Sequence, residues 1–214
     1  EMILAAHPSI AGIGENIRLN TLGMRHTTDE MDQKLVDELG AEYLGMLDEL
    51  VPDRSMRRVV DKMPGNYLYI GLASRILPGS RIIHCKRDAR DTCLSIYFQA
   101  FGPWVKYARD IESIAHQYLG YLRVMQHWRE TLDVEVHESV YEDLTADPEP
   151  HIRAMIDHIG MPFDNACLEP HKTKSNVHTA SIAQVRNPIY RSSNQRWKNY
   201  EKHIGPMLDL LANA

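Results

Sequence analysis

The sequence predicts an α/β fold in which helices flank a parallel sheet. Residues Arg58–Lys62 form a short run with an apolar centre that predicts a strand, and Asn66–Leu77 predicts a helix. The apolar residues Ile82, Ile83 and Cys85 then predict a second, buried strand. Strand, helix and strand within about thirty residues form a βαβ unit, which implies that the strands are parallel.

Length and composition are those of an ordinary globular protein. The 214 residues are 43% hydrophobic and 25% charged, so we expect a single domain over residues 1–214. No run approaches the roughly 18 apolar residues of a membrane span. Three cysteines cannot build a disulfide framework, which indicates a reducing, cytoplasmic location. None of the eleven histidines has a familiar metal-ligand spacing, so no metal is expected.

The first fifty residues predict two helices and a turn. Glu1–Ala6 resembles the last turns of an apolar helix, so we expect a piece of a longer chain whose first strand lies upstream. Gly12 and Gly14 then form a flexible turn that carries Glu15, which is either a solvated carboxylate or a general base. Thr27–Leu50 predicts an amphipathic helix that begins at a capping box of Thr27 and Glu30.

The second half of the chain continues the alternation of helices and strands. Apolar residues recur at helical spacing from Ile111 to Leu132, and Val134–Val140 alternates as a strand that ends in a turn at Tyr141–Leu144. Asp147–Ile159 predicts a helix with Asp147 as its N-cap, and Pro206–Leu211 predicts a short amphipathic helix.

The central segment Arg81–Ser95 has the pattern of an anion site. A strand passes through a polar turn into a helix, and such a junction combines free backbone N–H groups with the positive end of the helix dipole. Arg87 lies at the turn, and Ser95 is about two helical turns later on the same side. A guanidinium and a hydroxyl placed in this way suit one phosphate group, although an arginine and a helical serine at such a junction are also common without a ligand.

Charge is distributed unevenly along a chain of net charge −5. Residues 1–50 hold ten acidic and three basic side chains, whereas residues 171–203 hold seven lysines or arginines and one glutamate. The basic segment is a solvated face, a nucleic-acid patch or part of a site for a small polyanion. Because residues 179–203 offer many hydrogen-bond donors and few apolar side chains, an anionic ligand would order them.

Four blocks resemble a known family. They are HPSIAGIGE, VVDKMPGNYLYIGL, RIIHCKRDARDTCLSIYF, and the pair VYEDL and TASIAQVRNPIYRSSNQRWKNYEKHI, in the family's order. The chain resembles sulfotransferases that use 3'-phosphoadenosine 5'-phosphosulfate (PAPS), in the bacterial branch similar to tyrosylprotein sulfotransferases. This resemblance implies a P-loop-NTPase-like three-layer fold. The family's first strand and phosphosulfate loop are absent from this chain, so we expect the fragment alone to be inactive.

The resemblance assigns four residues to the nucleotide. Arg87 and Ser95 match the pair that holds the 3'-phosphate, and Tyr141 matches a tyrosine near the adenine and phosphate. Arg196 occupies the place of a basic residue in the C-terminal cofactor-binding segment. PAPS is therefore the expected co-substrate, without a metal.

Three further residues match positions at the reacting centre. Glu15 falls at or beside the family's catalytic base, in a turn one residue longer than in the tyrosylprotein enzymes. Lys62 and Ser181 match residues near the transferring sulfonate and the bridging oxygen. Gln99 replaces an arginine of the tyrosylprotein enzymes, so their peptide specificity does not carry over.

The partner predictions are less specific. The acceptor can be a sugar, peptide, lipid or small phenol, no nucleic acid is expected, and a homodimer stays open. Two alternative functions also remain at this point. One is a P-loop-like nucleotide kinase, which needs a Gly-Lys-Ser/Thr loop and Mg²⁺ ligands. The other is a non-catalytic module that binds a nucleotide or nucleic acid through the basic segment.

Overall fold

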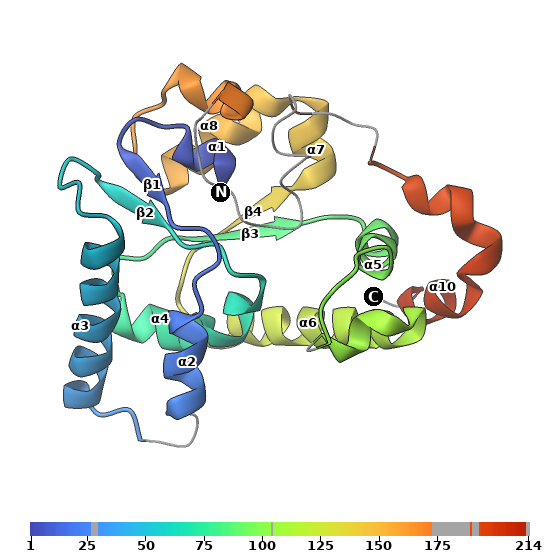
Figure 1. The fold of residues 1–214 in the computed structure, drawn as a ribbon, viewed down its shortest axis with the longest axis horizontal. Coiled ribbons are helices and arrows are strands. Elements are labelled where there is room, and N and C mark those ends of the chain that lie inside the picture. The colour runs from blue at the N-terminus through green and yellow to red at the C-terminus, as the bar shows by residue number, and fades with distance from the viewer. Residues whose placement is uncertain (27–29, 104, 173–188, 190–192, 213–214) are drawn as a thin grey trace.

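The strands form two parallel pairs, and the predicted α/β class is confirmed. A computed structural model describes residues 1–26, 30–103, 105–172, 189 and 193–212. In these residues β1 (Ile10–Gly12) pairs with β2 (Arg58–Val60), and β3 (Ile82–Lys86) pairs with β4 (Val136–Val140). The strands therefore lie in two separate pairs within the described part of the chain, and not in one continuous sheet (Figure 1). Strands β2, β3 and β4 were predicted, whereas β1 was not, and its Gly12 was expected in a flexible turn.

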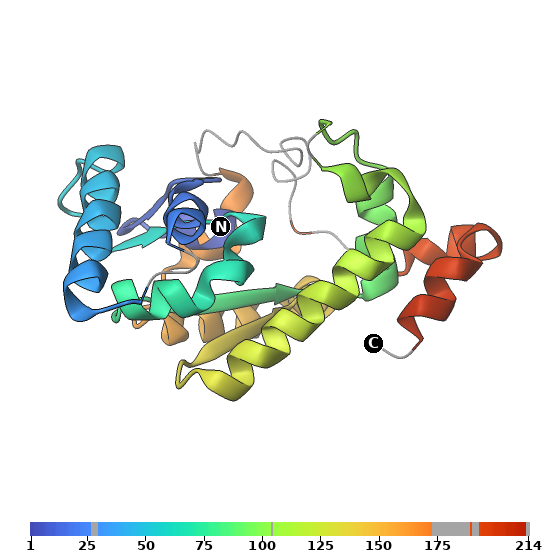
Figure 2. The ribbon, with the colours of Figure 1, turned by 90° about the horizontal axis from the view of Figure 1, so that it is seen from below.

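Helices cover the strand pairs and carry the chain between them. The described α-helices are α1 (Met2–Ala5), α2 (Arg18–Arg25), α3 (Gln33–Leu50), α4 (Ile70–Ile76), α5 (Ala89–Tyr97), α6 (Ile111–Thr131), α7 (Tyr141–Ala146), α8 (Pro148–His158) and α10 (Gly205–Leu211). The described 3₁₀ turns are η1 (Pro64–Tyr69), η2 (Lys106–Arg109), η3 (Asn165–Leu168), η4 (Pro170–Lys172) and η5 (Arg196–His203). Helices α3 and α10 lie at opposite ends of the molecule in both views (Figures 1 and 2).

Three groups of buried apolar side chains hold these elements together. One group joins α1 and β1 to α8, and it includes Leu4, Ile10 and Ile152. A second joins α5 and α6 to α10, and a third joins α2, α3 and α4. Helix α6 packs against η1 near one group and against α5 and α10 in another, so it connects the two halves of the molecule (Figure 2).

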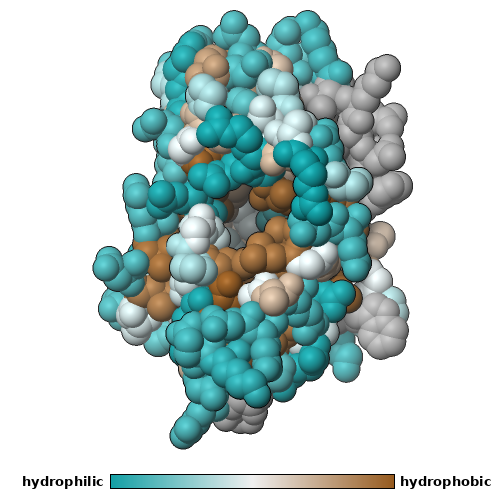
Figure 3. Space-filling model, turned by 90° about the vertical axis from the view of Figure 1, so that its left-hand side faces the viewer, coloured by the Kyte–Doolittle hydropathy of each residue, from teal (hydrophilic) through white to brown (hydrophobic). Residues whose placement is uncertain are grey.

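One face leaves apolar side chains uncovered by the described residues. Figure 3 shows the side that lies to the left in Figure 1, where the centre of the surface is hollowed. Apolar residues line the hollow and hydrophilic residues surround it. Burial of apolar surface is therefore less complete on this side than around the three groups.

Several predicted boundaries are wrong. Helix α3 begins at Gln33, because the Asp32 side chain accepts a hydrogen bond from Leu35 N and caps the helix there. The predicted cap Thr27 lies outside the described residues. The turn predicted at Tyr141–Leu144 is helix α7, and α2 was not predicted at all. The helix predicted over Asn66–Leu77 is divided into the 3₁₀ turn η1 and helix α4.

The strand, polar turn and helix predicted over Arg81–Ser95 are confirmed. Strand β3 and helix α5 occupy the strand and helix expected around Arg87, with the polar turn between them. The long helix expected before residue 132 is α6, and the strand expected before Tyr141 is β4. The signals were the apolar run of β3, the helical spacing of apolar residues in α6 and the alternation of apolar residues in β4.

Candidate anion site and reacting residues

Strands β3 and β4 bring Arg87 and Tyr141 together at their carboxyl ends. Lys86 pairs with Val140 in the parallel register, and these are the last residues of the two strands. Arg87 and Tyr141 therefore directly follow the strands, side by side. The Arg87 guanidinium carbon lies 5.0 Å from the centroid of the Tyr141 ring. This distance is that of a cation–π contact, which fixes the guanidinium over the ring.

A cavity of about 130 Å³ lies beside this pair. Residues from α5, α7 and the segment before and within η5 line it. They include all four residues assigned to the nucleotide, which are Arg87, Ser95, Tyr141 and Arg196. Side chains more than a hundred positions apart therefore converge on one small pocket. Its size suits a compact anion such as a single phosphate group.

The pocket is cationic and its donors are incompletely used. One terminal nitrogen of Arg87 donates to Ser193 O at 2.6 Å, whereas its buried Nε has no hydrogen-bond partner among the described residues. Arg196 is exposed and its guanidinium lies 5.6 Å from the centroid of the Phe98 ring. Ser95 is also exposed. A buried donor without an acceptor is costly, and an anion in the pocket would supply the acceptor.

The start of helix α5 differs from the expectation of free amides. The Asp88 carboxylate accepts hydrogen bonds from Arg90 N and Asp91 N, while Asp88 N donates to Glu142. The first amides of the helix are therefore already paired with a carboxylate. An anion in this pocket would be held by side chains, and not by the N-terminus of the helix.

The other strand pair brings Glu15 and Lys62 together in the same way. The parallel ladder of β1 and β2 continues past both strands, because Ile13 N donates to Val60 O and Lys62 N donates to Gly14 O. Gly14 has φ +71, which glycine adopts without strain, and this turn points the following side chain towards β2. Lys62 Nζ then lies 2.5 Å from Glu15 Oε1. Both side chains are about one-third to two-fifths exposed, at 34% and 40%.

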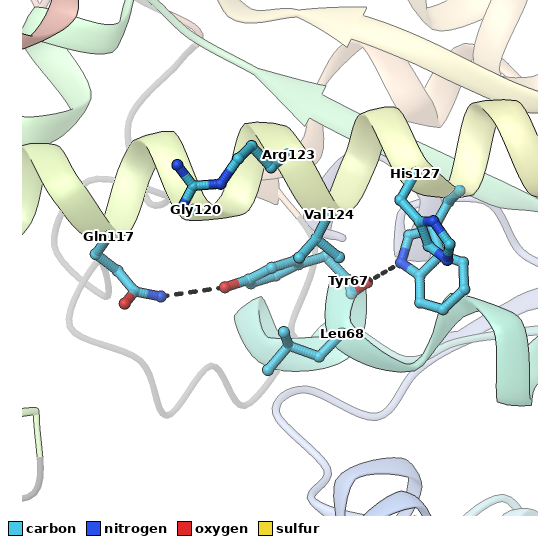
Figure 4. Close-up of a pocket in the computed structure, with 8 residues that line it drawn as sticks. Tyr67, Leu68, Gln117, Gly120, Arg123, Val124 and His127 are labelled. Atoms are coloured by element: carbon cyan, nitrogen blue, oxygen red, sulfur yellow. Dashed lines mark hydrogen bonds between the residues drawn. The ribbon is translucent and has the colours of Figure 1, made fainter.

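Three hydrogen bonds hold Asp61 and Tyr67, which lie before and after Lys62 in the sequence. Tyr43 in α3 donates to Asp61 Oδ2 at 2.5 Å, and burial raises the pKa of Asp61. On the other side, Tyr67 in η1 is held by α6: Gln117 donates to its hydroxyl at 3.2 Å, and Trp128 Nε1 donates to its carbonyl at 2.7 Å (Figure 4). These contacts attach the chain before Lys62 to α3 and the chain after it to α6.

A larger, shallow groove of about 520 Å³ lies between η1 and α6. Figure 4 shows the Tyr67 ring lying across it, between Gln117 and His127. None of the residues predicted to act on a ligand lines this groove. The smaller cavity beside Arg87 is therefore the candidate site, because two arginines and the unpaired Arg87 Nε are found there.

Sequence reasoning missed some residues of the pocket. Asp91, Phe98 and Ser193 line it, and none was predicted. Asp91 follows Arg87 by one helical turn, so helical spacing alone could have placed it on the same side. Ser181, predicted near the reacting centre, lies outside the described residues.

No group of three or more His, Cys, Asp or Glu side chains in the described part of the chain is placed to hold a metal ion. No helix within the described ranges is long and apolar enough to cross a bilayer.

Parallel strand pairs with cationic side chains at their carboxyl ends define an α/β protein with a candidate anion site. The model of the "Sulfotransferase family" matches residues 1–165 of this chain. The chain belongs to the sulfotransferase family. The resemblance of the sequence blocks to the sulfotransferase family is thereby confirmed.

The chain is also similar to a curated protein and to solved structures. An uncharacterized protein from Aquifex aeolicus (strain VF5) is 36% identical over 185 residues, which is 85% of this chain and 24% of that protein. The chain thus spans about a quarter of the length of this relative.

Two solved sulfotransferase domains share the fold. The domain from the curacin biosynthetic pathway has a TM-score of 0.63 at 16% identity, over 99% of this chain and 90% of that one. The domain from the Synechococcus PCC 7002 olefin synthase has a TM-score of 0.65 at 18% identity, over 92% and 81%. The P-loop-like α/β fold expected from the sequence is consistent with these matches.

Proposed function

We propose that the protein transfers a sulfonate group from PAPS to an acceptor hydroxyl or amine. The observation that carries this proposal is the convergence of Arg87, Ser95, Tyr141 and Arg196 on one small cationic pocket. The family match favours sulfonate transfer over the kinase and nucleic-acid alternatives. The residues of this chain suit the 3'-phosphate of the nucleotide, because two guanidinium groups and a hydroxyl can satisfy its oxygens.

Each pocket residue has a role in this proposal. The buried Arg87 Nε has no other acceptor among the described residues, so it can donate to a phosphate oxygen. Arg196 and Ser95 are exposed at the same pocket and supply further donors. The Tyr141 ring holds the Arg87 guanidinium in place by a cation–π contact.

The pair Glu15 and Lys62 supplies the groups for the transfer. In an in-line displacement the acceptor oxygen forms a bond to sulfur while the bond from sulfur to the 5'-phosphate oxygen breaks. Glu15 takes the acceptor proton as the new bond forms. Lys62, with Ser181, stabilises the charge that develops on the leaving adenosine 3',5'-bisphosphate. The ion pair between Glu15 and Lys62 orients the carboxylate before the acceptor arrives.

Calorimetry with two nucleotides tests the donor assignment on the full-length protein. Adenosine 3',5'-bisphosphate should bind more tightly than adenosine 5'-monophosphate, which lacks the 3'-phosphate. Arg87→Ala should weaken binding of the bisphosphate by roughly 10- to 100-fold and remove most of this difference, as expected for a charge-assisted hydrogen bond. Arg54→Ala, which removes an exposed arginine paired with Asp48, is the control and should change neither affinity. Equal affinity of the wild-type protein for both nucleotides would reject the proposal.

A further inference from the structure

Asp91 is a buried carboxylate in a pocket that gathers positive charge. Its side chain is 2% exposed, and it lines the cavity together with Arg87 and Arg196. A negative charge at this position opposes an anionic ligand and costs desolvation energy on folding. Such a residue therefore needs compensating contacts.

Those contacts come from a distant segment of the chain. Asp91 Oδ2 accepts a hydrogen bond from Gln195 N at 2.6 Å, and Oδ1 accepts one from Trp197 N at 2.8 Å. Both donors are backbone amides, and they lie immediately before and after Arg196. Gln195 has φ +56 in the left-handed region, so its backbone conformation is one that needs support from its surroundings.

The residue before Asp91 supports the same segment. The Arg90 guanidinium carbon lies 4.1 Å from the centroid of the Trp197 ring, and Trp197 is buried. Arg90 is itself held by Asp88, with Nε donating to Oδ1 at 3.1 Å and a terminal nitrogen donating to Oδ2 at 2.5 Å. Asp91 thus holds the backbone on both sides of Arg196, and Arg90 holds the side chain of Trp197.

We propose that Asp91 is a positioning residue that holds Arg196 at the anion pocket. Its oxygens are used by the two amides that flank Arg196, so it acts on the ligand through that residue and not by direct contact. This inference rests on the proposed function, since it takes the bound anion to be the 3'-phosphate of the nucleotide. It also explains why an acidic side chain is present in a cationic pocket.

The test is a double-mutant cycle on the full-length protein, with binding of adenosine 3',5'-bisphosphate measured by calorimetry. Asp91→Asn replaces one acceptor oxygen by an NH₂ group that faces a backbone N–H, so one of the two contacts is lost. We expect affinity to fall about tenfold, although a negative charge has been removed. Arg196→Ala should weaken binding by about the same factor, and the double variant should bind no more weakly than Arg196→Ala alone.

Additional measurements separate positioning from general stability. Asp91→Asn should raise KM for PAPS about tenfold and leave kcat within about twofold, because the reacting groups lie elsewhere. Asp157→Asn, an exposed aspartate on α8, is the matched control and should change neither constant. If Asp91→Asn does not fold, Asp91→Ser takes its place in the same cycle.

The possible results have distinct meanings. Additive losses in the cycle, or an Asp91→Asn protein that binds the bisphosphate as well as the wild type, would overturn the positioning role and leave the proposed function intact. A wild-type protein that does not bind the bisphosphate would overturn both. Non-additive losses with an intact kcat would support the inference.

Discussion

The Arg87 guanidinium lies 5.0 Å from the Tyr141 ring because both residues directly follow paired parallel strands. The same arrangement recurs at the other strand pair, where Glu15 and Lys62 meet just beyond β1 and β2. In each case residues distant in sequence become neighbours through the register of a parallel ladder. Strand pairing therefore positions Arg87, Tyr141 and the pair of Glu15 and Lys62, whereas helix α5 positions Ser95 and η5 positions Arg196.

The stacking of Arg87 on Tyr141 gives the first prediction. Tyr141→Ala should weaken binding of adenosine 3',5'-bisphosphate by roughly 3- to 30-fold, because the guanidinium loses a contact of about 0.5–2 kcal/mol. Tyr141→Phe keeps the ring and should retain most of the affinity. Calorimetry on the full-length variants measures both, with Tyr107→Ala as a control outside the pocket. A larger loss for the phenylalanine variant than for the alanine variant would contradict this role of the ring.

The pair of Glu15 and Lys62 gives the second prediction. Glu15→Gln keeps the size of the side chain but cannot accept a proton, so kcat should fall by roughly 10²- to 10⁴-fold. Affinity for adenosine 3',5'-bisphosphate should stay unchanged, because Glu15 does not line the anion pocket. Sulfonate transfer by the full-length protein and calorimetry supply the two readings, and Glu49→Gln, an exposed residue of α3, is the control. Turnover at the wild-type rate would remove Glu15 as the base.

Much of the anion pocket around Arg87 could be predicted from the sequence, since local patterns determine the strand and helix that carry Arg87 and Ser95. The apolar run of β3 followed by the polar turn and helix α5 places Arg87 and Ser95 on the same side, and both line the pocket. The convergence of Tyr141 and Arg196 on that pocket was expected only from the family resemblance. No local pattern indicates that β4 pairs with β3, because pairing between strands separated by fifty residues depends on tertiary contacts.

Other features could not be predicted, and the reasons are physical. Helix α3 has two plausible caps, and the hydrogen bond from Leu35 N to Asp32 shows which one the structure uses. The Tyr141–Leu144 segment contains acidic residues common in turns, yet it forms α7, which packs against α8. Asp91 lies in the first turn of α5, where acidic residues are common. Its partners, Gln195 and Trp197, lie more than a hundred positions away, so only the folded chain shows its contacts.

Two glycines of the same helix give the third prediction, which concerns stability. A Cβ at Gly40 would lie 2.7 Å from the backbone oxygen of Ile76, so the close packing of α3 on α4 requires glycine there. Gly40→Ala should lower the free energy of unfolding by about 1–3 kcal/mol. Gly45 has open space around it, and Gly45→Ala should instead raise it by about 0.5–1 kcal/mol. Denaturant unfolding of both variants measures the opposite signs, and a stabilised Gly40→Ala protein would contradict the packing argument.

The buried imidazole of His84 gives a prediction about pH. His84 is 8% exposed, forms a hydrogen bond with Tyr121, and has Glu138 3.6 Å from its Nδ1. Burial lowers the pKa of His84, and the positive charges of Arg129 and Lys86 lower it further, while Glu138 opposes them.

A lowered pKa in the folded state fixes the sign of the pH effect. As the pH falls through the ordinary histidine value of about 6.5, the unfolded chain takes up this proton before the folded chain does. The contribution of His84 to stability is therefore complete above about pH 7 and is lost progressively below about pH 6.5. His84→Gln cannot titrate, so the free energy of unfolding should fall less steeply between about pH 7.5 and about pH 5.5 than in the wild type. Urea unfolding across this range measures the slope.

The pKa of the more exposed His137 is also lowered by burial, so His137→Gln is the matched comparison and should flatten the slope less. Parallel slopes for the wild type and His84→Gln would show that His84 is protonated as readily in the folded chain as in the unfolded one.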